Sequence, residues 1–143
     1  MPEPGVPDDS ELPEAVRTLL HTRIDSYEKL EVLRLLHDDP RPDWSAAQLS
    51  TRLRMALPLV EAALEALHSD GFVRHSEGSG ARGSYSLANS TLTPATQQLV
   101  HEYGARPLLV MQVMTVYAIE RVRSGALRAF VEIFAQKKDT GSS

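Results

Sequence analysis

The sequence predicts a mainly helical domain with a small β-hairpin, an α+β fold, and three observations support this prediction. Apolar residues recur at helical spacing over most of the chain. Residues 72–88 instead contain two short runs that read as strands, the second with apolar residues alternating with serine, and a glycine-rich stretch lies between them. A packed core is expected, because 42% of the 143 residues are hydrophobic and only 24% are charged.

The N-terminal part predicts two helices behind a flexible start. Residues 1–11 are rich in proline and acidic residues, so we expect a disordered tip. A first helix is predicted with Pro13 at its first position, where the missing N–H group is no loss. A second helix is expected to begin behind Asp25, because Asp25 and Glu28 have the spacing of a capping box. Pro40 follows the end of this helix.

Two further helices are predicted close together. Ser45 and Gln48 form a second capping box, and Trp44 before them can act as a hydrophobic staple. These residues predict a short helix that ends near Leu53. A turn then separates it from a longer helix that begins near Pro58.

A β-hairpin is predicted after these helices. Gly71 lies where a helix commonly ends, residues 72–76 read as a strand, and in residues 84–88 the apolar Tyr85 and Leu87 alternate with serine. The glycines between the strands suit a hairpin tip, because glycine readily adopts positive φ angles. Three helices followed by such a hairpin are typical of a winged helix-turn-helix, in which the hairpin is the wing. We assign this domain to residues 12–90.

The C-terminal part predicts one helix near Thr93 and a long helix from Pro107. Ser124 and Gly125 are expected to kink or divide the long helix, because glycine weakens a helix and serine can cap the next segment. We interpret residues 91–138 as a helical dimerisation segment and residues 139–143 as a disordered tail.

Parts of the sequence resemble bacterial winged-helix regulators of the MarR type. The similar stretches are residues 45–53, residues 57–67 and the run Asp70-Gly-Phe-Val73. The resemblance covers about residues 26–89, and it implies a winged-helix fold and a role in transcription. The whole chain also resembles a group of winged-helix proteins with a long C-terminal helix and an Arg-Ala-Phe-x-x-x-Phe pattern, here residues 128–134. No activity is established for that group.

The predicted recognition helix lacks the side chains that usually contact DNA. Its exposed positions are expected at Ala56, Pro58, Glu61, Ala62 and Glu65, which include no cation and no amide. DNA binding depends on Lys and Arg that neutralise phosphates, and the net charge of the chain is −4. The basic residues lie around this helix instead. The DNA-contact candidates are Arg52, Arg54, Arg74, His75 and Arg82.

Two functional hypotheses follow. In the first, the chain is a homodimeric transcriptional regulator that contacts double-stranded DNA mainly through the wing and turn arginines. In the second, the winged helix is a protein-interaction module whose third helix docks a protein partner. The candidate residues for that partner are Leu57, Leu59, Glu61 and Glu65.

The C-terminal helix contains the run 108–119, in which only Gln112 and Thr115 are polar. This run is shorter than the ~20 residues that a membrane span needs. A helix apolar on nearly all sides must be buried on several sides, so we expect a second subunit to cover it. A purely intramolecular core and a basic amphipathic helix at a membrane surface are the alternatives. The dimer-interface candidates are Leu108, Met111, Met114, Tyr117, Leu127, Phe130, Val131 and Phe134.

Other functional classes find little support. The chain has no cysteine, which excludes thiol catalysis and thiolate metal sites. Residues 78–83 match G-x-G-x-x-G literally, but a strand is predicted after them, whereas nucleotide binding requires a helix there. The five histidines never lie three or four residues apart. We therefore expect no enzyme, no metal site and no cofactor, and, since no leader motif is evident at Met1, a cytoplasmic protein.

Overall fold

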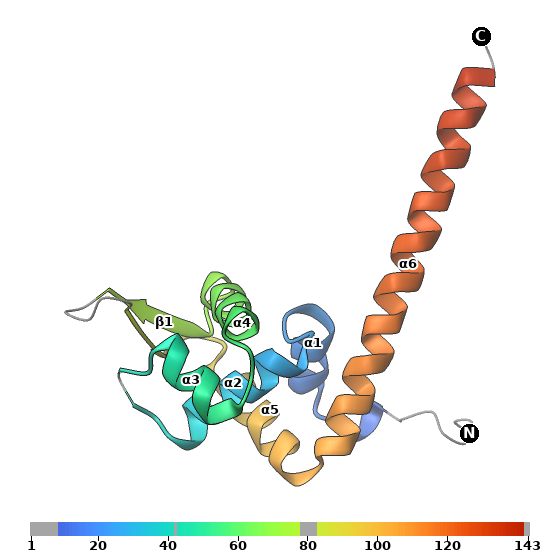
Figure 1. Ribbon diagram of the computed structural model, residues 1–143. Coiled ribbons are helices and arrows are strands. Elements are labelled where there is room, and N and C mark those ends of the chain that lie inside the picture. Colours follow the sequence, from blue (N-terminus) through green and yellow to red (C-terminus); the bar gives the residue numbers. More distant parts are fainter. Residues whose placement is uncertain (1–8, 42, 78–82, 142–143) are drawn as a thin grey trace.

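In the computed structural model of the chain, residues 9–41, 43–77 and 83–141 are described, except for the side chains of Phe134 and residues 136–141. This part of the chain is mainly helical and contains one antiparallel hairpin, which confirms the predicted fold class (Figure 1). The elements in chain order are the 3₁₀ helix η1 (Asp9–Glu11), α1 (Glu14–Thr22), α2 (Tyr27–Asp38), α3 (Ala46–Leu53), α4 (Leu57–Ser69), β1 (Val73–Ser76), β2 (Ser84–Leu87), α5 (Thr93–Ala105) and α6 (Pro107–Gly141).

The helix-turn-helix of α3 and α4 follows directly from local sequence signals. The Ser45 hydroxyl accepts a hydrogen bond from the Gln48 N–H at 3.1 Å, and the Gln48 side chain accepts one from the Ser45 N–H at 3.0 Å. This is the predicted capping box, and α3 ends at Leu53 as predicted. Arg54 makes the turn in the left-handed region, with φ 56°. Gly71, with φ 88°, follows the end of α4, as expected.

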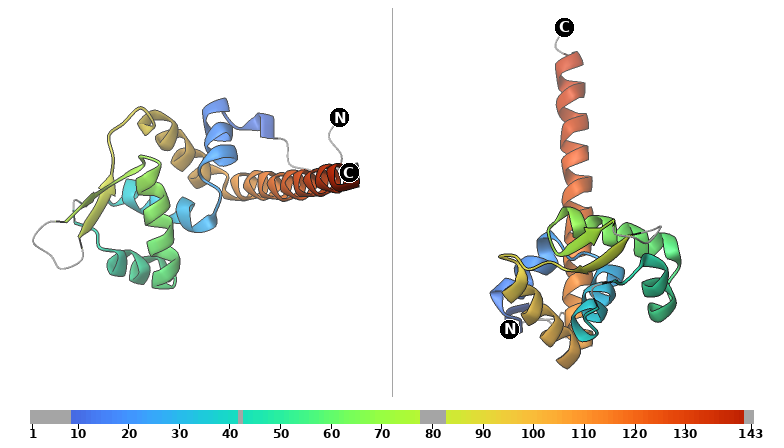
Figure 2. Two further views of the ribbon diagram at one scale, coloured as in Figure 1. Left: turned by 90° about the horizontal axis from the view of Figure 1, so that it is seen from above. Right: turned by 90° about the vertical axis from the view of Figure 1, so that its left-hand side faces the viewer.

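The hairpin is extended by one backbone bridge to the segment before α3. Val73 lies opposite Leu87, and His75 lies opposite Tyr85. The Tyr85 N–H donates to the Trp44 carbonyl oxygen at 2.7 Å, which fixes the wing against the start of α3. Figure 2 shows the hairpin beside α4 and α3.

A continuous hydrophobic core joins the winged helix to the flanking helices. Trp44, Leu49 and Leu64 are buried within the winged helix. The same core extends into α1, α5 and the first part of α6, where Leu99 and Val113 are buried. The described helices are therefore packed as one unit around the winged helix, up to the point where α6 leaves the body.

The long helix α6 differs from its prediction. It runs without interruption from Pro107 to Gly141 and projects away from the rest of the chain (Figure 1). The predicted kink at Ser124 and Gly125 is therefore wrong, and residues 139–141, which we expected in a disordered tail, are helical. A single glycine costs a helix only about 1 kcal/mol relative to alanine, and its neighbours Ala126 and Leu127 are strong helix formers. In the described part of the chain, no helix is long and apolar enough to span a membrane.

Three N-terminal predictions also need correction. Residues 9–11 form a 3₁₀ turn, and the Tyr117 hydroxyl donates to the Asp9 carboxylate at 2.6 Å, so the expected disordered tip is wrong for these residues. Pro13 is the N-cap of α1 rather than its first residue. Ser26, not Asp25, caps α2, because its hydroxyl accepts a hydrogen bond from the Lys29 N–H at 3.2 Å. Asp25 instead forms an ion pair with the Lys29 side chain at 2.7 Å.

Candidate nucleic-acid interface

The predicted DNA-contact residues are exposed on the turn and the wing. Arg52 lies in the last turn of α3, and Arg54 is the turn residue itself. Arg74 and His75 lie on β1, with both side chains exposed. Arg82 lies outside the described residues. The structure therefore places cations at the α3–α4 turn and on the hairpin that packs beside α4.

Four arginines elsewhere in the described part of the chain form ion pairs, whereas those of the turn and the wing, like Arg17, Arg121, Arg123 and Arg128, form none with a described residue. Arg23, Arg34, Arg41 and Arg106 form ion pairs with Asp70, Asp38, Asp39 and Glu102, respectively. No described residue forms an ion pair with Arg52, Arg54 or Arg74. These three guanidinium groups are therefore available to a ligand such as a phosphate, without an internal carboxylate to displace.

The exposed face of α4 is acidic, as the sequence predicted. Ala56, Pro58, Glu61, Ala62 and Glu65 are all exposed, and none of them is a cation. A phosphate backbone that approached this face would meet two carboxylates. Contacts to the edges of bases by Arg, Asn or Gln are excluded at these five positions.

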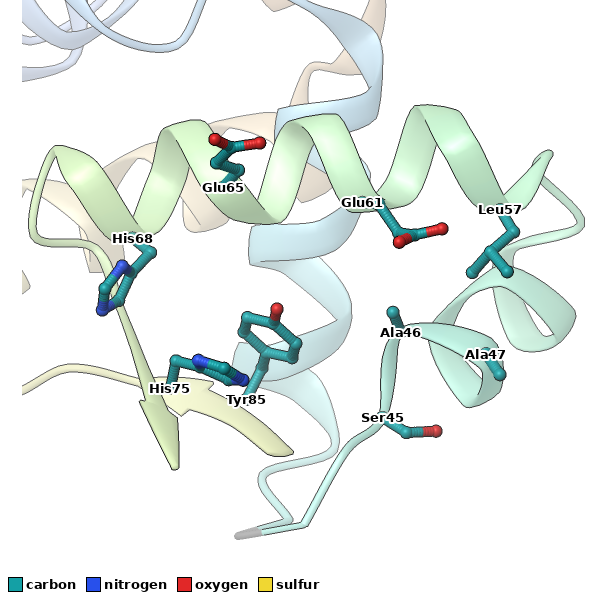
Figure 3. Close-up of a pocket in the computed structure, with 9 residues that line it drawn as sticks. All are labelled: Ser45, Ala46, Ala47, Leu57, Glu61, Glu65, His68, His75 and Tyr85. Atoms are coloured by element: carbon teal, nitrogen blue, oxygen red, sulfur yellow. The ribbon is translucent and has the colours of Figure 1, made fainter. Parts of the chain in front are cut away.

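A groove of about 540 Å³ lies between α4, the hairpin and the first turn of α3 (Figure 3). We call it the α4–hairpin groove, and its lining residues are Ser45, Ala46, Ala47, Leu57, Glu61, Glu65, His68, His75 and Tyr85. Of the predicted partner-contact residues, Leu57, Glu61 and Glu65 come together here. Leu59 is exposed but is not among the residues of the groove.

Aromatic rings form the hairpin side of this groove. The His75 and Tyr85 rings stack with centroids 4.5 Å apart, and the His68 ring lies edge-on to His75 at 6.1 Å. In Figure 3 the Tyr85 hydroxyl points toward α4. Burial raises the pKa of Tyr85, and the negative charges of Glu61 and Glu65 raise it further. The field in the groove therefore disfavours anions.

Sequence reasoning missed His68 and Tyr85 as members of this site. Leu57, Glu61, Glu65 and His68 are spaced so that they lie on one face of a helix, and this spacing could have indicated His68. Tyr85 lies on β2, so only the pairing of the hairpin beside α4 places it there. Among the described residues, no group of three or more His, Asp or Glu side chains could hold a metal ion.

The dimer-interface candidates divide into two sets. Met114 and Tyr117 are buried in the chain's own core, where they pack against neighbouring helices. Met111 is half-buried. Leu108, Leu127, Phe130 and Val131 are 56–73% exposed, and the side chain of Phe134 is not described. The first part of α6 thus agrees with the intramolecular alternative, whereas its later part leaves apolar side chains exposed.

Comparisons with known proteins show which solved structures have a similar fold. No family model and no curated protein matches the sequence. Among solved structures, reduced HlyU from Vibrio cholerae N16961 is similar, with a TM-score of 0.50 and 21% sequence identity over 64% of this chain and 90% of that chain. The adhesin competence repressor AdcR from Streptococcus pyogenes has a TM-score of 0.48 and 14% sequence identity over 86% of this chain and 89% of that chain. MepR, a transcription regulator of the Staphylococcus aureus multidrug efflux pump MepA, has a TM-score of 0.47 and 10% sequence identity over 82% of this chain and 90% of that chain.

The chain thus has the winged helix-turn-helix fold. Its likeness to HlyU confirms, at the level of fold, the winged-helix resemblance that the sequence indicated.

Proposed function

We propose that this protein is a winged-helix transcriptional regulator that binds double-stranded DNA as a homodimer. The observation that carries the proposal is the set of three exposed arginines, Arg52, Arg54 and Arg74, which have no ion-pair partner among the described residues. They lie on the turn before α4 and on the wing beside it. In other winged-helix and helix-turn-helix proteins these are the elements that face DNA.

The mode of contact follows from the charges. Arg52 and Arg54 bind phosphates on one side of α4, and Arg74 binds the backbone on the wing side, with Arg82, which lies between the two strands in the sequence, as a further candidate; His75 lines the acidic α4–hairpin groove instead and is the weaker candidate. Glu61 and Glu65 keep α4 itself from close contact with the backbone. Sequence preference then depends on DNA shape and deformability more than on base contacts by α4.

The experiment is fluorescence anisotropy of a labelled, mixed-sequence duplex titrated with the protein at about 50 and about 200 mM salt. We expect binding at low salt that weakens steeply at the higher concentration, because bound phosphates release their counterions. The Arg52→Ala/Arg74→Ala variant should lose most of this affinity on every sequence.

The matched control is Arg34→Ala/Arg106→Ala, which removes the same charge from α2 and from the end of α5. Both arginines already pair with a carboxylate. We expect this variant to keep its DNA affinity within about twofold, because neither residue lies on the turn or the wing. Absence of binding at low salt, or equal losses in the two variants, would contradict the proposal.

A second candidate function is supported by the α4–hairpin groove. Its two carboxylates and its aromatic side suit a basic segment of a protein partner, since cations bind both carboxylates and the faces of aromatic rings. In this case Glu61→Lys abolishes recovery of a partner in a pull-down, while DNA affinity stays equal or improves. If DNA affinity falls instead, α4 contacts DNA and the partner hypothesis fails.

A further inference from the structure

The exposed part of α6 has a regular apolar pattern. Ile119, Val122, Ala126, Ala129 and Ile133 are separated alternately by three and four residues, which places them on one face of the helix. We call these five residues the α6 seam. All five are exposed, and Ile119, Val122 and Ile133 are 47–72% accessible to solvent. Such spacing is typical of a helix that packs lengthwise against another helix.

A second apolar feature adjoins the start of the seam. A groove of about 500 Å³ lies between α6 and the residues that begin α2. We call it the α6 groove, and its lining residues are Asp25, Ser26, Tyr27, Met114, Thr115, Ala118, Ile119, Val122 and Arg123. It therefore shares Ile119 and Val122 with the seam and has a second side formed by residues 25–27. An inserted helix would be covered on two sides.

From these two features we infer that α6 pairs in antiparallel orientation with α6 of a second copy, about a two-fold axis near Ser124. In this register Thr115 lies opposite Ile133 of the second copy, Ile119 opposite Ala129, and Val122 opposite Ala126. The inference rests on the homodimer of the proposed function and specifies its geometry. It adds Tyr27 and Ala118, on the sides of the α6 groove, to the interface.

The seam is complementary to itself in this register. Each of the three layers joins a β-branched side chain to one of different size, Ile or Val against Ala, or Thr against Ile, so that the two helices interdigitate without large voids. Ala126 and Ala129 also allow the helix axes to approach closely. The matching residues lie on either side of Ser124, as an isologous two-fold contact requires.

The α6 groove lies where the helix of a second copy would pass in this register. In the antiparallel pair, residues 126–133 of one copy lie beside residues 115–122 of the other, which is where the α6 groove is located. By helical spacing Phe130 flanks the seam, whereas Leu127 and Val131 lie farther round the helix, Val131 nearly opposite the seam, so the antiparallel pair leaves these two side chains on its outer surface.

The absence of cysteine from the sequence allows a direct test by disulfide formation. In the variant Ile119→Cys/Ala129→Cys, each new thiol lies opposite the other kind in the second copy. We expect this variant to form a disulfide-linked dimer under mild oxidation, seen on a non-reducing gel. The two positions are ten residues apart, about 15 Å along the helix, so they cannot pair within one chain.

The two single variants are the matched controls. In the antiparallel pair, a cysteine at position 119 would lie about 15 Å along the axis from its own counterpart, and so would a cysteine at position 129, so neither Ile119→Cys nor Ala129→Cys forms a covalent dimer. A parallel pair would link both single variants. Links in the single variants, or none in the double variant, would overturn the inference.

Light scattering and DNA anisotropy on the same samples separate this inference from the proposed function. A dimer by light scattering without the expected links means that the homodimer exists with another geometry. A monomer overturns both the antiparallel pair and the homodimer. DNA binding by any of these species is measured independently, because the two cysteine positions are far from Arg52, Arg54 and Arg74 in sequence and lie on another element.

Discussion

At the scale of the residue, Arg54 combines backbone strain with a candidate function. Its φ of 56° places a long side chain in the left-handed region, which costs a non-glycine residue about 1 kcal/mol. Glycine has no such cost, so we expect Arg54→Gly to leave the free energy of unfolding unchanged or raise it by up to about 1 kcal/mol. The same variant should weaken DNA binding. Urea unfolding and anisotropy measure the two effects.

Arg54→Ala is the control for this prediction, because alanine removes the charge but keeps the strain. Equal stability of the two variants would show that the turn adopts another backbone conformation in solution. If Arg54→Gly kept full DNA affinity, Arg54 would be removed from the proposed interface.

Ionisation of Tyr117 makes the stability of the fold depend on pH in the alkaline range. Burial raises the pKa of Tyr117 to about 12, and its hydrogen bond to Asp9 contributes. The folded state thus favours the neutral phenol of Tyr117. The stability that this neutral group contributes to the fold is complete below the ordinary pKa of about 10 and is lost as the pH rises toward 12. Tyr117→Phe loses the hydrogen bond to the Asp9 carboxylate and should be less stable than the unaltered protein at pH 9 by about 1.5 kcal/mol, and the gap should shrink as the pH rises toward 12.

Urea unfolding of both proteins at several pH values checks this prediction. Tyr27→Phe is a useful control, because Tyr27 is 44% exposed and its loss should change the stability at pH 9 much less. A gap that stays constant between pH 9 and pH 12 would mean that the Tyr117 hydroxyl ionises as it does in the unfolded chain.

At the scale of the element, Gly125 weakens α6 without a structural reason within one chain. It is not at positive φ, and a Cβ atom added to it would meet no heavy atom within 4 Å. Gly125→Ala should therefore stabilise the protein by about 0.5–1 kcal/mol, with higher helicity by circular dichroism. The matched control is Gly104→Ala in α5, which also meets nothing within 4 Å but lies near a helix end. A loss of stability on Gly125→Ala would show that a neighbour approaches this position closely.

Elements were predicted best where the signal is local. The Ser45 capping box and Gly71 act through neighbouring backbone groups, so the sequence alone defines α3 and the end of α4. Contacts between distant residues have no such signal. The bond from Tyr117 to Asp9 spans 108 residues and orders a segment whose composition is typical of disorder. Likewise, the α4–hairpin groove depends on Tyr85, which is positioned by its pairing with β1 and by the bridge to Trp44.

At the scale of the whole molecule, the proposed DNA binding by an acidic protein requires a few local cations. The net charge of −4 repels a polyanion at long range, and Glu61 and Glu65 repel it locally. In the proposed homodimer each copy has a small cationic set on the turn and the wing, so we expect the affinity to depend on presenting two such sets together. The antiparallel α6 pair would hold two copies in one fixed arrangement and thus supply both sets to one duplex.

This arrangement predicts the salt dependence of DNA binding. The slope of log affinity against log salt is about −0.9 for each phosphate neutralised. A dimer that uses three cations from each copy should have a slope of about −5, which is a loss on the order of 10³-fold between 50 and 200 mM salt. Arg52→Ala removes one cation from each copy, so the slope should become less steep by about 2 in a dimer and by only about 1 in a monomer.

Anisotropy titrations at four salt concentrations measure both slopes. A change of about 1 in a protein that is dimeric by light scattering would mean that only one wing and turn of the pair contact the duplex, and an unchanged slope would mean that Arg52 contacts no phosphate.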